Sequence, residues 1–282
     1  FGQVAEGFVN KLIQEKKDFN LSITSRQETH QIELNNFKIT SYHFTDDKFD
    51  SSIDKKLKEA NYILISIPPI EGKDIVAKYF DKNLQGITNC KWITYLSATS
   101  VYGNHNGEWV NEKSKTKPTS INGTSRLKVE NEWFKLSEEN NLPLQIFRLS
   151  GIYSIQNNIL KRLIAGQINV IKKENHFFSR IHVEDIANIL FNSLNKFKRN
   201  EIYNISDDKP APQEEVAIYG SKLLKINSLR FFQTDSLEDG MLKDFYRDSK
   251  KVENKKVKEF FNYKFTYPTY KEGLDSILNK IA

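Results

Sequence analysis

The 282-residue sequence contains a single cysteine, Cys90, and this scarcity excludes two classes of protein. One cysteine cannot form an internal disulfide, and it cannot build a cysteine-rich metal site. Long hydrophobic runs are also missing, because no apolar stretch approaches the ~20 residues that a membrane-spanning helix needs. The first residues lack the basic-then-apolar pattern of a signal peptide. We therefore expect a cytoplasmic protein with no membrane partner, no internal disulfide and no metal.

The net charge is +6, yet the basic residues are not gathered in one place. A nucleic-acid-binding surface needs a basic patch or stripe with stacking aromatic residues. Here the lysines are spread along the chain and interleaved with acidic residues, as in the segment 250–256, K-K-V-E-N-K-K. We interpret the lysine excess as solvated faces and expect no nucleic-acid partner.

Short apolar runs alternate with helical patterns through the first 150 residues. Runs rich in β-branched and aromatic residues predict strands at 21–24, 39–44, 62–67, 92–96 and 144–147. Apolar residues at helical spacing predict helices at 4–13, 51–59, 74–80 and 120–139. This alternation indicates an α/β fold, a Rossmann-like doubly wound parallel sheet with helices on both faces.

The pattern changes after Arg148. Helices are expected at 159–165, 183–194, 211–224 and 270–281, with short strands at 168–171 and 202–205. We expect a dinucleotide-binding domain over residues 1–150 and a smaller α/β substrate lobe over 151–282, interleaved with the first. No internal repeat or low-complexity segment interrupts this organisation.

A glycine turn opens the first predicted helix. The segment Gly2-Gln-Val-Ala5 matches the last part of G-x-G-x-x-G/A, in which glycine admits a pyrophosphate and the helix N-terminus offers free N–H groups. The next strand ends in Ser25 and Arg26, which suit a 2′-phosphate, whereas NAD favours an acidic residue near this position. These residues predict NADP as the cofactor, with NAD as the alternative. A glycine that only starts a helix, and an exposed arginine without a ligand, would explain them too.

A βαβ phosphate-binding unit has a strand before its glycine turn, but the sequence begins at Phe1. In the doubly wound order, that first strand lies at the centre of the sheet, between the strands at 21–24 and 62–67. We therefore expect a gap at this place, unless another segment fills it.

Small polar residues follow the predicted strand at 92–96. In open α/β sheets, ligands bind in the crevice beyond the carboxyl ends of the strands. Ser97, Thr99 and Tyr102 are therefore the candidates for residues of the active-site edge.

Several segments together resemble the extended short-chain dehydrogenase/reductase superfamily, also called the NAD-dependent epimerase/dehydratase family. The chain is most similar to atypical members that are described simply as NAD(P)-dependent oxidoreductases. The resemblance covers essentially the whole chain. It rests on residues 2–5, 95–103 (Y-L-S-A-T-S-V-Y-G), 122–126 (N-G-T-S-R), 148–153 (R-L-S-G-I-Y), 179–187 (S-R-I-H-V-E-D-I-A) and 267–273 (Y-P-T-Y-K-E-G).

The resemblance implies a set of binding residues and partners. The implied cofactor contacts are Gly2, Gln3, Val4, Ser25, Arg26, Ser66, Ile67, Pro68, Ser97, Arg126, Leu149, Ser150, Gly151 and Ile152. The implied substrate contacts are Tyr153, Arg180 and His182. It also implies a small-molecule substrate and a homodimer formed through the helices after Ile70 and after Ser120.

The residues that carry proton transfer in this family are replaced. The family has a Ser or Thr three residues before the Val of Val-Tyr-Gly, and a Tyr-x-x-x-Lys pair in the following helix, where the tyrosine is the general acid/base. Here these positions hold Ala98, Asn122 and Arg126. Asparagine cannot deliver a proton, and arginine stays protonated, although Arg126 can still bind ribose or phosphate.

Three interpretations follow from these replacements. The protein is an NAD(P)-dependent oxidoreductase or epimerase whose acid/base group comes from elsewhere, such as Tyr102, Tyr153 or His182. Alternatively, it is an NADP-binding sensor or regulatory module without turnover, or a metabolite-binding protein with a vestigial site. For each of the three named side chains, a packing role is the competing explanation.

Overall fold

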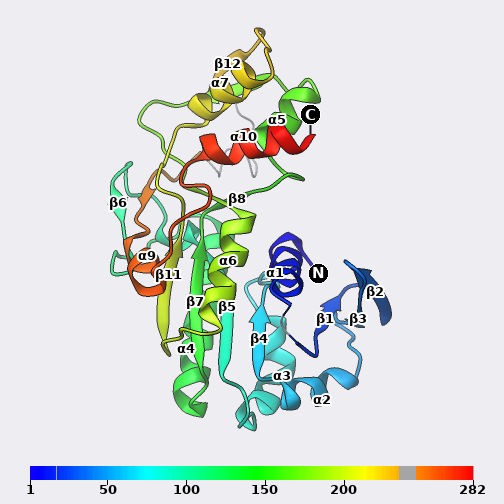
Figure 1. The fold of residues 1–282 in the computed structure, drawn as a ribbon. Coiled ribbons are helices and arrows are strands. Elements are labelled where there is room, and N and C mark those ends of the chain that lie inside the picture. Colours follow the sequence, from blue (N-terminus) through cyan, green and yellow to red (C-terminus); the bar gives the residue numbers. More distant parts are fainter. Residues whose placement is uncertain (17, 235–245, 282) are drawn as a thin grey trace. The chain divides into compact units, whose positions relative to one another are not determined.

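The computed structural model describes residues 1–16, 18–234 and 246–281 (Figure 1). Helices and strands alternate along the chain, and the predicted α/β fold with a parallel sheet is confirmed. None of the helices in the described ranges is long and apolar enough to cross a membrane.

The chain divides into two compact units that interleave along the sequence. Unit 1 comprises Phe1–Ser97, Ser125–Phe147 and Ile186–Ile202. Unit 2 comprises Ala98–Thr124, Arg148–Asp185 and Tyr203–Ala282. Each half of the sequence therefore contributes segments to both units.

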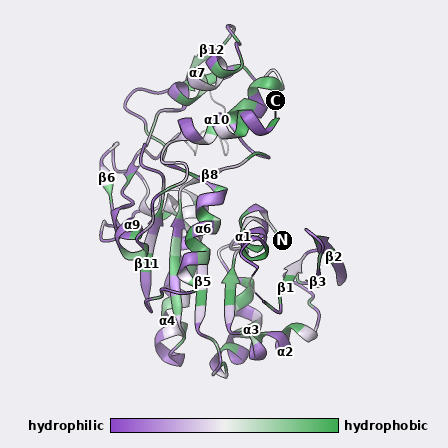
Figure 2. Cartoon of the chain, viewed as in Figure 1, coloured by the Kyte–Doolittle hydropathy of each residue, from purple (hydrophilic) through white to green (hydrophobic). Residues whose placement is uncertain are grey.

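The main sheet has four strands in the order β11-β7-β5-β4. These strands are β4 (Tyr62–Ile65), β5 (Trp92–Ala98), β7 (Leu144–Leu149) and β11 (Glu201–Ile205). Every residue of β7 and nearly every residue of β5 is buried, as expected of strands that are covered on both faces. Figure 2 shows β4 as a hydrophobic strand. The helices α2 (Ser52–Glu59), α3 (Ile75–Gln85) and α4 (Ile121–Asn140) connect or flank these strands along the chain.

A second sheet of three strands has the order β1-β3-β2. Here β1 (Ser22–Ser25) runs parallel to β3 (Phe37–His43), and β2 (His30–Leu34) runs antiparallel to it. Within the described part of the chain, no strand hydrogen-bonds to both β1 and β4, which belong to separate sheets. The sheet is therefore interrupted at the place where the sequence predicts a gap.

Strand β2 is not among the strands predicted from the sequence. Asn35 and Asn36 connect β2 to β3 with φ angles of 48° and 67°, and Leu34 pairs with Phe37. Two adjacent residues with positive φ form the two-residue turn whose twist suits a hairpin, and asparagine tolerates that conformation. The alternating segment H-Q-I-E-L before the Asn-Asn pair was the signal that could have revealed this strand.

The only cysteine of the sequence lies just before the amino end of β5. Cys90 is half-buried, and its Sγ donates to the backbone oxygen of Trp92 at 3.4 Å. Burial raises the pKa of the Cys90 thiol to about 11. Because the thiolate is the nucleophilic form, this thiol is poorly reactive at neutral pH.

Unit 2 is built from short elements around a small apolar core. Its strands form three parallel pairs: β8 (Gly151–Tyr153) with β10 (Arg180–His182), β9 (Asn169–Lys172) with β12 (Arg230–Gln233), and β6 (Trp109–Val110) with β13 (Lys251–Val252). Its helical elements include η1 (Thr99–Tyr102), α5 (Ile159–Ile164), α7 (Gln213–Leu223), α9 (Lys255–Phe261) and α10 (Tyr270–Ile281). Residues such as Leu160, Val216 and Leu274 meet in the core between α5, α7 and α10.

A buried carboxylate fixes the segment that leads into α10. Asp185 lies in the first turn of α6 (Val183–Ser193) and is fully buried. Its carboxylate accepts hydrogen bonds from the Tyr263 hydroxyl at 2.6 Å, the Thr266 N–H at 2.8 Å and the Tyr267 N–H at 3.0 Å. Three donors on one carboxylate hold this stretch of unit 2 in a single conformation.

Candidate functional site

Two strand ends of unit 1 bring predicted cofactor residues to one level. Ile65 of β4 pairs with Tyr95 of β5 in parallel register, so Ser66 and Ile67 follow at the level of Leu96 and Ser97. Ser97 is 2% exposed, and its buried hydroxyl oxygen has no hydrogen-bond partner in the described structure. A buried hydroxyl without a partner is unusual, and it fits a position that a ligand completes.

The glycine turn lies at the same edge as the end of β1. Gly2 is the N-cap of α1 (Gln3–Gln14) in an extended conformation, and no side chain caps the helix there. The amino nitrogen of Phe1 donates to the Thr24 oxygen at 3.1 Å. A Cβ added to Gly2 would meet no atom within 4 Å, so the space beside this helix N-terminus is open. The first turn of a helix leaves backbone N–H groups without a partner within the helix, and such groups suit an anion.

The apolar face of α1 anchors this turn. Val4, Phe8 and Leu12 are buried, as the sequence predicts. The ring of Phe8 stacks on Trp92, the first residue of β5, with 6.2 Å between centroids. The helix therefore packs against the amino end of β5 through Phe8, some two turns after Gly2.

The residues after β1 form an exposed basic position. Ser25, the last residue of β1, accepts a hydrogen bond from the Ser41 hydroxyl at 3.0 Å, and its carbonyl accepts the Phe44 N–H at 2.8 Å. Arg26 follows and is exposed. Across the described ranges, no carboxylate lies within ion-pair distance of its guanidinium. Its charge is available to an anion.

Arg126 lies at the end of β5. Its Nη1 donates to the carbonyl oxygen of Leu96 at 2.9 Å, one residue before Ser97. The neighbouring Tyr95 is fully buried, and burial raises the pKa of its hydroxyl although the charge of Arg126 opposes the shift. Arg126 thus fixes the backbone beside Ser97, while Asn122 is exposed on α4.

In unit 2, Tyr102 is locked into the interior. Thr99 and Tyr102 bound the η1 turn, and Tyr102 is fully buried. Its hydroxyl donates to Asn204 Oδ1 at 2.7 Å, and the Arg148 guanidinium lies 4.9 Å from the ring centroid. Burial raises the pKa of Tyr102, and Arg148 opposes that shift. This geometry favours the packing role for Tyr102 over proton transfer.

Gly103 closes the η1 turn. Its φ of 69° and ψ of −151° belong to a region that only glycine populates readily. A Cβ at this position would lie 1.7 Å from the Lys117 oxygen. The Lys117 N–H donates to the Tyr102 oxygen at 3.1 Å, so this close approach ties the turn to the strand-like segment before α4.

The backbone at the end of β7 is fixed by neighbouring strands. The Ser150 N–H donates to the Ile205 oxygen and the Gly151 N–H to the Ser179 oxygen, both at 3.0 Å. The Ser150 hydroxyl is buried and, among the described residues, finds no hydrogen-bond partner. The segment Leu149, Ser150, Gly151, Ile152 is therefore held rigidly in unit 2, as a binding loop needs to be.

Tyr153 and His182 pack against each other. Their rings meet at 5.0 Å between centroids in an edge-on arrangement, and both residues are more than nine-tenths buried. The Tyr153 hydroxyl faces Gly273, whose added Cβ would lie within 3 Å of that ring. Burial raises the pKa of Tyr153 and lowers the pKa of His182 to about 4. Both side chains have the surroundings of core residues.

A cavity of about 790 Å³ opens in unit 2 beside these residues. Arg180 lines it, and its guanidinium donates to the oxygens of Phe178 and Ala211 at 2.9 Å and to Gln213 Oε1 at 2.8 Å. Arg162 also lines the cavity, and none of the described lining residues is an Asp or Glu. Two guanidinium groups among the described lining residues favour an anionic ligand. The substrate candidates Tyr153 and Arg180 line it, and His182 does not.

Sequence reasoning missed several residues around this cavity and at the end of β3. Arg162 of α5 and Gln213 of α7 line the cavity although no motif marks them, and Tyr270 of α10 lines it from within the segment 267–273 that carries part of the family resemblance. His43 lies at the end of β3 in a polar cluster, and a histidine without metal-ligand spacing gave no signal in the sequence. These residues come together only through the tertiary fold.

A family model matches the middle of the chain. Residues 76–206 match the model described as the NAD dependent epimerase/dehydratase family. The matched segment holds β5, α4, β7 and β8, while the glycine turn and Arg26 precede it.

The likeness in fold to solved structures extends over nearly the whole chain. A functionally unknown conserved protein from Silicibacter pomeroyi has 28% identity and a TM-score of 0.87, covering 99% of this chain and 96% of the other. A UDP-glucose 4-epimerase from Thermotoga maritima, solved with UDP-glucose, has 12% identity and a TM-score of 0.78, covering 99% and 95%. A UDP-glucuronic acid 4-epimerase from Bacillus cereus, in complex with NAD, has 13% identity and a TM-score of 0.76, covering 99% and 94%. The comparison with curated proteins found no match.

A buried histidine of unit 2 gives a prediction for pH-dependent stability. His176 is 2% exposed between the rings of Phe178 and Tyr246, and burial followed by the charge of Lys173 lowers its pKa to about 4. Because the folded pKa lies below the unfolded value of about 6.5, protonation favours the unfolded state. Stability is full above pH ~6.5 and falls as the pH drops toward 4, by about 2 kcal/mol for this group after allowance for solvent screening.

Urea unfolding of the wild type and the His176→Phe variant between pH 7 and pH 4 measures this effect. We expect the variant to lose less stability on acidification than the wild type. The control is His30→Phe, because the His30 ring lies at the surface. Parallel pH profiles for wild type and His176→Phe would contradict the prediction.

Proposed function

We propose that the protein is an NADP-preferring oxidoreductase or epimerase-like enzyme of the extended short-chain dehydrogenase/reductase type. The observation that carries the proposal is that unit 1 combines three features that suit a phosphorylated dinucleotide. These are the open helix N-terminus at Gly2, the unpaired charge of Arg26 and the buried hydroxyl of Ser97. The helix N-terminus and the guanidinium each suit an anionic group, and the buried hydroxyl suits a polar ring.

Each proposed cofactor contact has a physical role. The N–H groups of Gln3 and Val4 suit the pyrophosphate, and Ser25 with Arg26 suits the 2′-phosphate. The remaining contacts follow strand ends or lie on α4: Ser66, Ile67, Pro68, Ser97, Arg126, Leu149, Ser150, Gly151 and Ile152. When bound, a nicotinamide cofactor supplies the hydride donor or acceptor, and the protein supplies position and charge.

The cavity of unit 2 is the proposed substrate site. Arg162 and Arg180 line it, and its described lining contains no acidic side chain, which supports a substrate with a phosphate or carboxylate group. Two proteins with a similar fold are a UDP-glucose 4-epimerase and a UDP-glucuronic acid 4-epimerase. We therefore propose a small or nucleotide-linked anionic metabolite as the substrate. A homodimer through α3 and α4 remains part of the proposal.

A second candidate function is cofactor binding without turnover. It is favoured by Ala98, Asn122 and Arg126 at the positions of the family's proton-transfer residues, and by the burial of Tyr102 and Tyr153. Loss of a positioned general acid/base commonly lowers a rate by about 10²–10⁴-fold. A sensor or regulatory module would need no such group.

Cofactor titration tests the first proposal. We expect NADPH fluorescence to change saturably on addition of the protein, with a Kd about tenfold lower for NADPH than for NADH, because a guanidinium–phosphate contact contributes roughly 1.4 kcal/mol or more. No binding of either dinucleotide at high micromolar concentration would remove both the enzyme and the sensor proposals. Transfer of deuterium from labelled NADPH to any member of a panel of nucleotide-linked and small carbonyl compounds would remove the sensor.

A further inference from the structure

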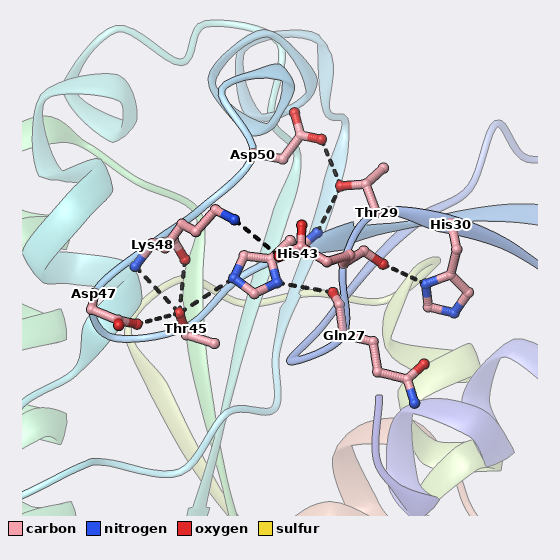
Figure 3. Close-up of polar contacts among 9 residues, drawn as sticks. Gln27, Thr29, His30, His43, Thr45, Asp47, Lys48 and Asp50 are labelled. Atoms are coloured by element: carbon pink, nitrogen blue, oxygen red, sulfur yellow. Dashed lines mark hydrogen bonds and ion pairs between the residues drawn. The ribbon is translucent and has the colours of Figure 1, made fainter.

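The turn that carries Arg26 is held in place by the end of the neighbouring strand. His43 is the last residue of β3 and pairs with Ser25 in the register of the two strands. Its ring Nδ1 lies 3.0 Å from the Gln27 oxygen, and its backbone N–H donates to Thr29 Oγ1 at 3.1 Å (Figure 3). His43 therefore hydrogen-bonds to two residues that follow Arg26, namely Gln27 and Thr29.

The neighbouring acceptor determines which ring nitrogen of His43 carries the proton. The Gln27 oxygen can only accept, so Nδ1 carries the proton in this bond. Its Nε2 lies 3.5 Å from Thr45 Oγ1, and that hydroxyl donates to Asp47 at 2.6 Å. His43 is 8% exposed, so little water competes for the bond to Gln27. The ring is a fixed donor at the inner side of the turn.

A second bond locks the far end of the turn. Thr29 Oγ1 accepts from the His43 N–H and donates to Asp50 at 2.6 Å. That bond is the first cause of the lowered pKa of Asp50. Asp50 in turn accepts the Ser52 N–H at 2.8 Å, which connects the turn to the start of α2.

The acidic residue of this turn pairs with a lysine. Glu28 lies two positions later and would favour NAD if its carboxylate reached the ribose hydroxyls. Instead its Oε1 lies 2.9 Å from Lys48 Nζ, and this bond lowers the pKa of Glu28. Fixing the backbone on both sides of Glu28 keeps its side chain with Lys48 and leaves Arg26 without a carboxylate partner.

We propose that His43 is a positioning residue that sets the preference for a 2′-phosphorylated dinucleotide by fixing the turn that carries Arg26. The inference rests on the proposed function, since it concerns the same cofactor edge. His43 acts through Arg26: it holds the backbone from which the guanidinium projects. A loose turn would let Arg26 move and Glu28 approach, and both changes weaken NADPH relative to NADH.

The test measures the Kd of NADPH and of NADH for the full chain by fluorescence, with thermal unfolding as a folding check. For His43→Leu we expect the ratio Kd(NADH)/Kd(NADPH) to fall at least fivefold, with the NADH Kd within twofold of the wild type. His43→Asn keeps a donor toward Gln27 and is expected to retain most of the ratio. Arg26→Gln should abolish the ratio, and adding His43→Leu to it should produce no further fall. The control Asn61→Leu removes a side-chain bond to a carbonyl at the amino end of β4 and should leave the ratio unchanged.

The outcomes separate the two proposals. A wild type that prefers NADPH, with His43→Leu unchanged in ratio, overturns the role of His43 and leaves the proposed function intact. A wild type that binds neither dinucleotide, or binds both equally, overturns both the cofactor preference and this inference. A purely structural role would lower the unfolding temperature or weaken both dinucleotides equally, which also overturns it. If His43→Leu does not fold, Thr29→Val removes the other two bonds and is measured in the same way.

Discussion

Replacing Gly103 with alanine is expected to destabilise the protein by more than about 4 kcal/mol, the range reserved for backbone clashes and other severe changes. The added Cβ would lie 1.7 Å from the Lys117 oxygen and 2.6 Å from its carbonyl carbon. Both atoms belong to backbone, so no side-chain rotation relieves the contact. The φ of 69° with ψ of −151° adds strain of its own for any residue with a side chain. Urea unfolding followed by circular dichroism measures the loss.

Gly166→Ala is the matched control for this substitution. Gly166 also has a positive φ, 77°, but an added Cβ there would meet no atom within 4 Å. Only the conformational term remains, so we expect a loss of about 1–2 kcal/mol. Equal losses for the two variants would show that the contact with Lys117 does not matter, and the description of the η1 turn would then be wrong.

Removing the Asp185 carboxylate is the second change with a large expected effect. Asp185→Ala leaves the N–H groups of Thr266 and Tyr267 and the Tyr263 hydroxyl without their acceptor. An unsatisfied buried donor costs about 1–3 kcal/mol, so we expect a total loss of about 3 kcal/mol, because part of the segment can relax toward water. Chemical denaturation at pH 7 gives the free energy of unfolding.

Asp275→Ala provides the comparison for Asp185. Asp275 accepts one hydrogen bond, from the Tyr219 hydroxyl at 2.8 Å, in the same unit. A single partly exposed bond contributes about 1 kcal/mol. If Asp185→Ala were no more damaging than Asp275→Ala, the segment before α10 would not depend on the carboxylate at the start of α6.

The strands of the main sheet could be predicted because burial on both faces leaves a plain signal. The runs at Tyr62 and Trp92 are apolar without helical spacing, and both became strands with the expected parallel pairing. Strand β2 was not predicted because only two of its five residues are hydrophobic. Its hairpin also depends on the positive φ angles of Asn35 and Asn36. The separation of β1 and β4 into two sheets agrees with the gap expected between them.

The site was predictable at the level of strand ends but not of side-chain directions. A position after a parallel strand must lie at the carboxyl edge, which brought Ser66 and Ser97 to the same level. Whether a side chain then faces that edge depends on its partners. Tyr102 turned inward because Asn204, about a hundred residues later, offers an acceptor, and Tyr153 turned inward because Gly273 leaves room for its ring. No local pattern contains that information.

Histidine positions show the same limit. His43 became part of a hydrogen-bonded turn through Gln27 and Thr29, and His182 became a neutral core group beside Tyr153. Neither outcome follows from spacing along the chain. The roles depend on which carbonyls, hydroxyls and rings the strands bring alongside.

The single thiol of Cys90 can serve as a probe of local opening in unit 1. Alkylation of this thiol at the amino end of β5 is expected to be slow while that end of unit 1 stays closed, because the thiol is half-buried and its pKa is raised. The rate at which Cys90 is alkylated under native conditions therefore reports local opening of this end of unit 1. The sequence has no second thiol that would contribute to the signal. The label would lie at the opposite end of β5 from Ser97 and from the proposed cofactor edge.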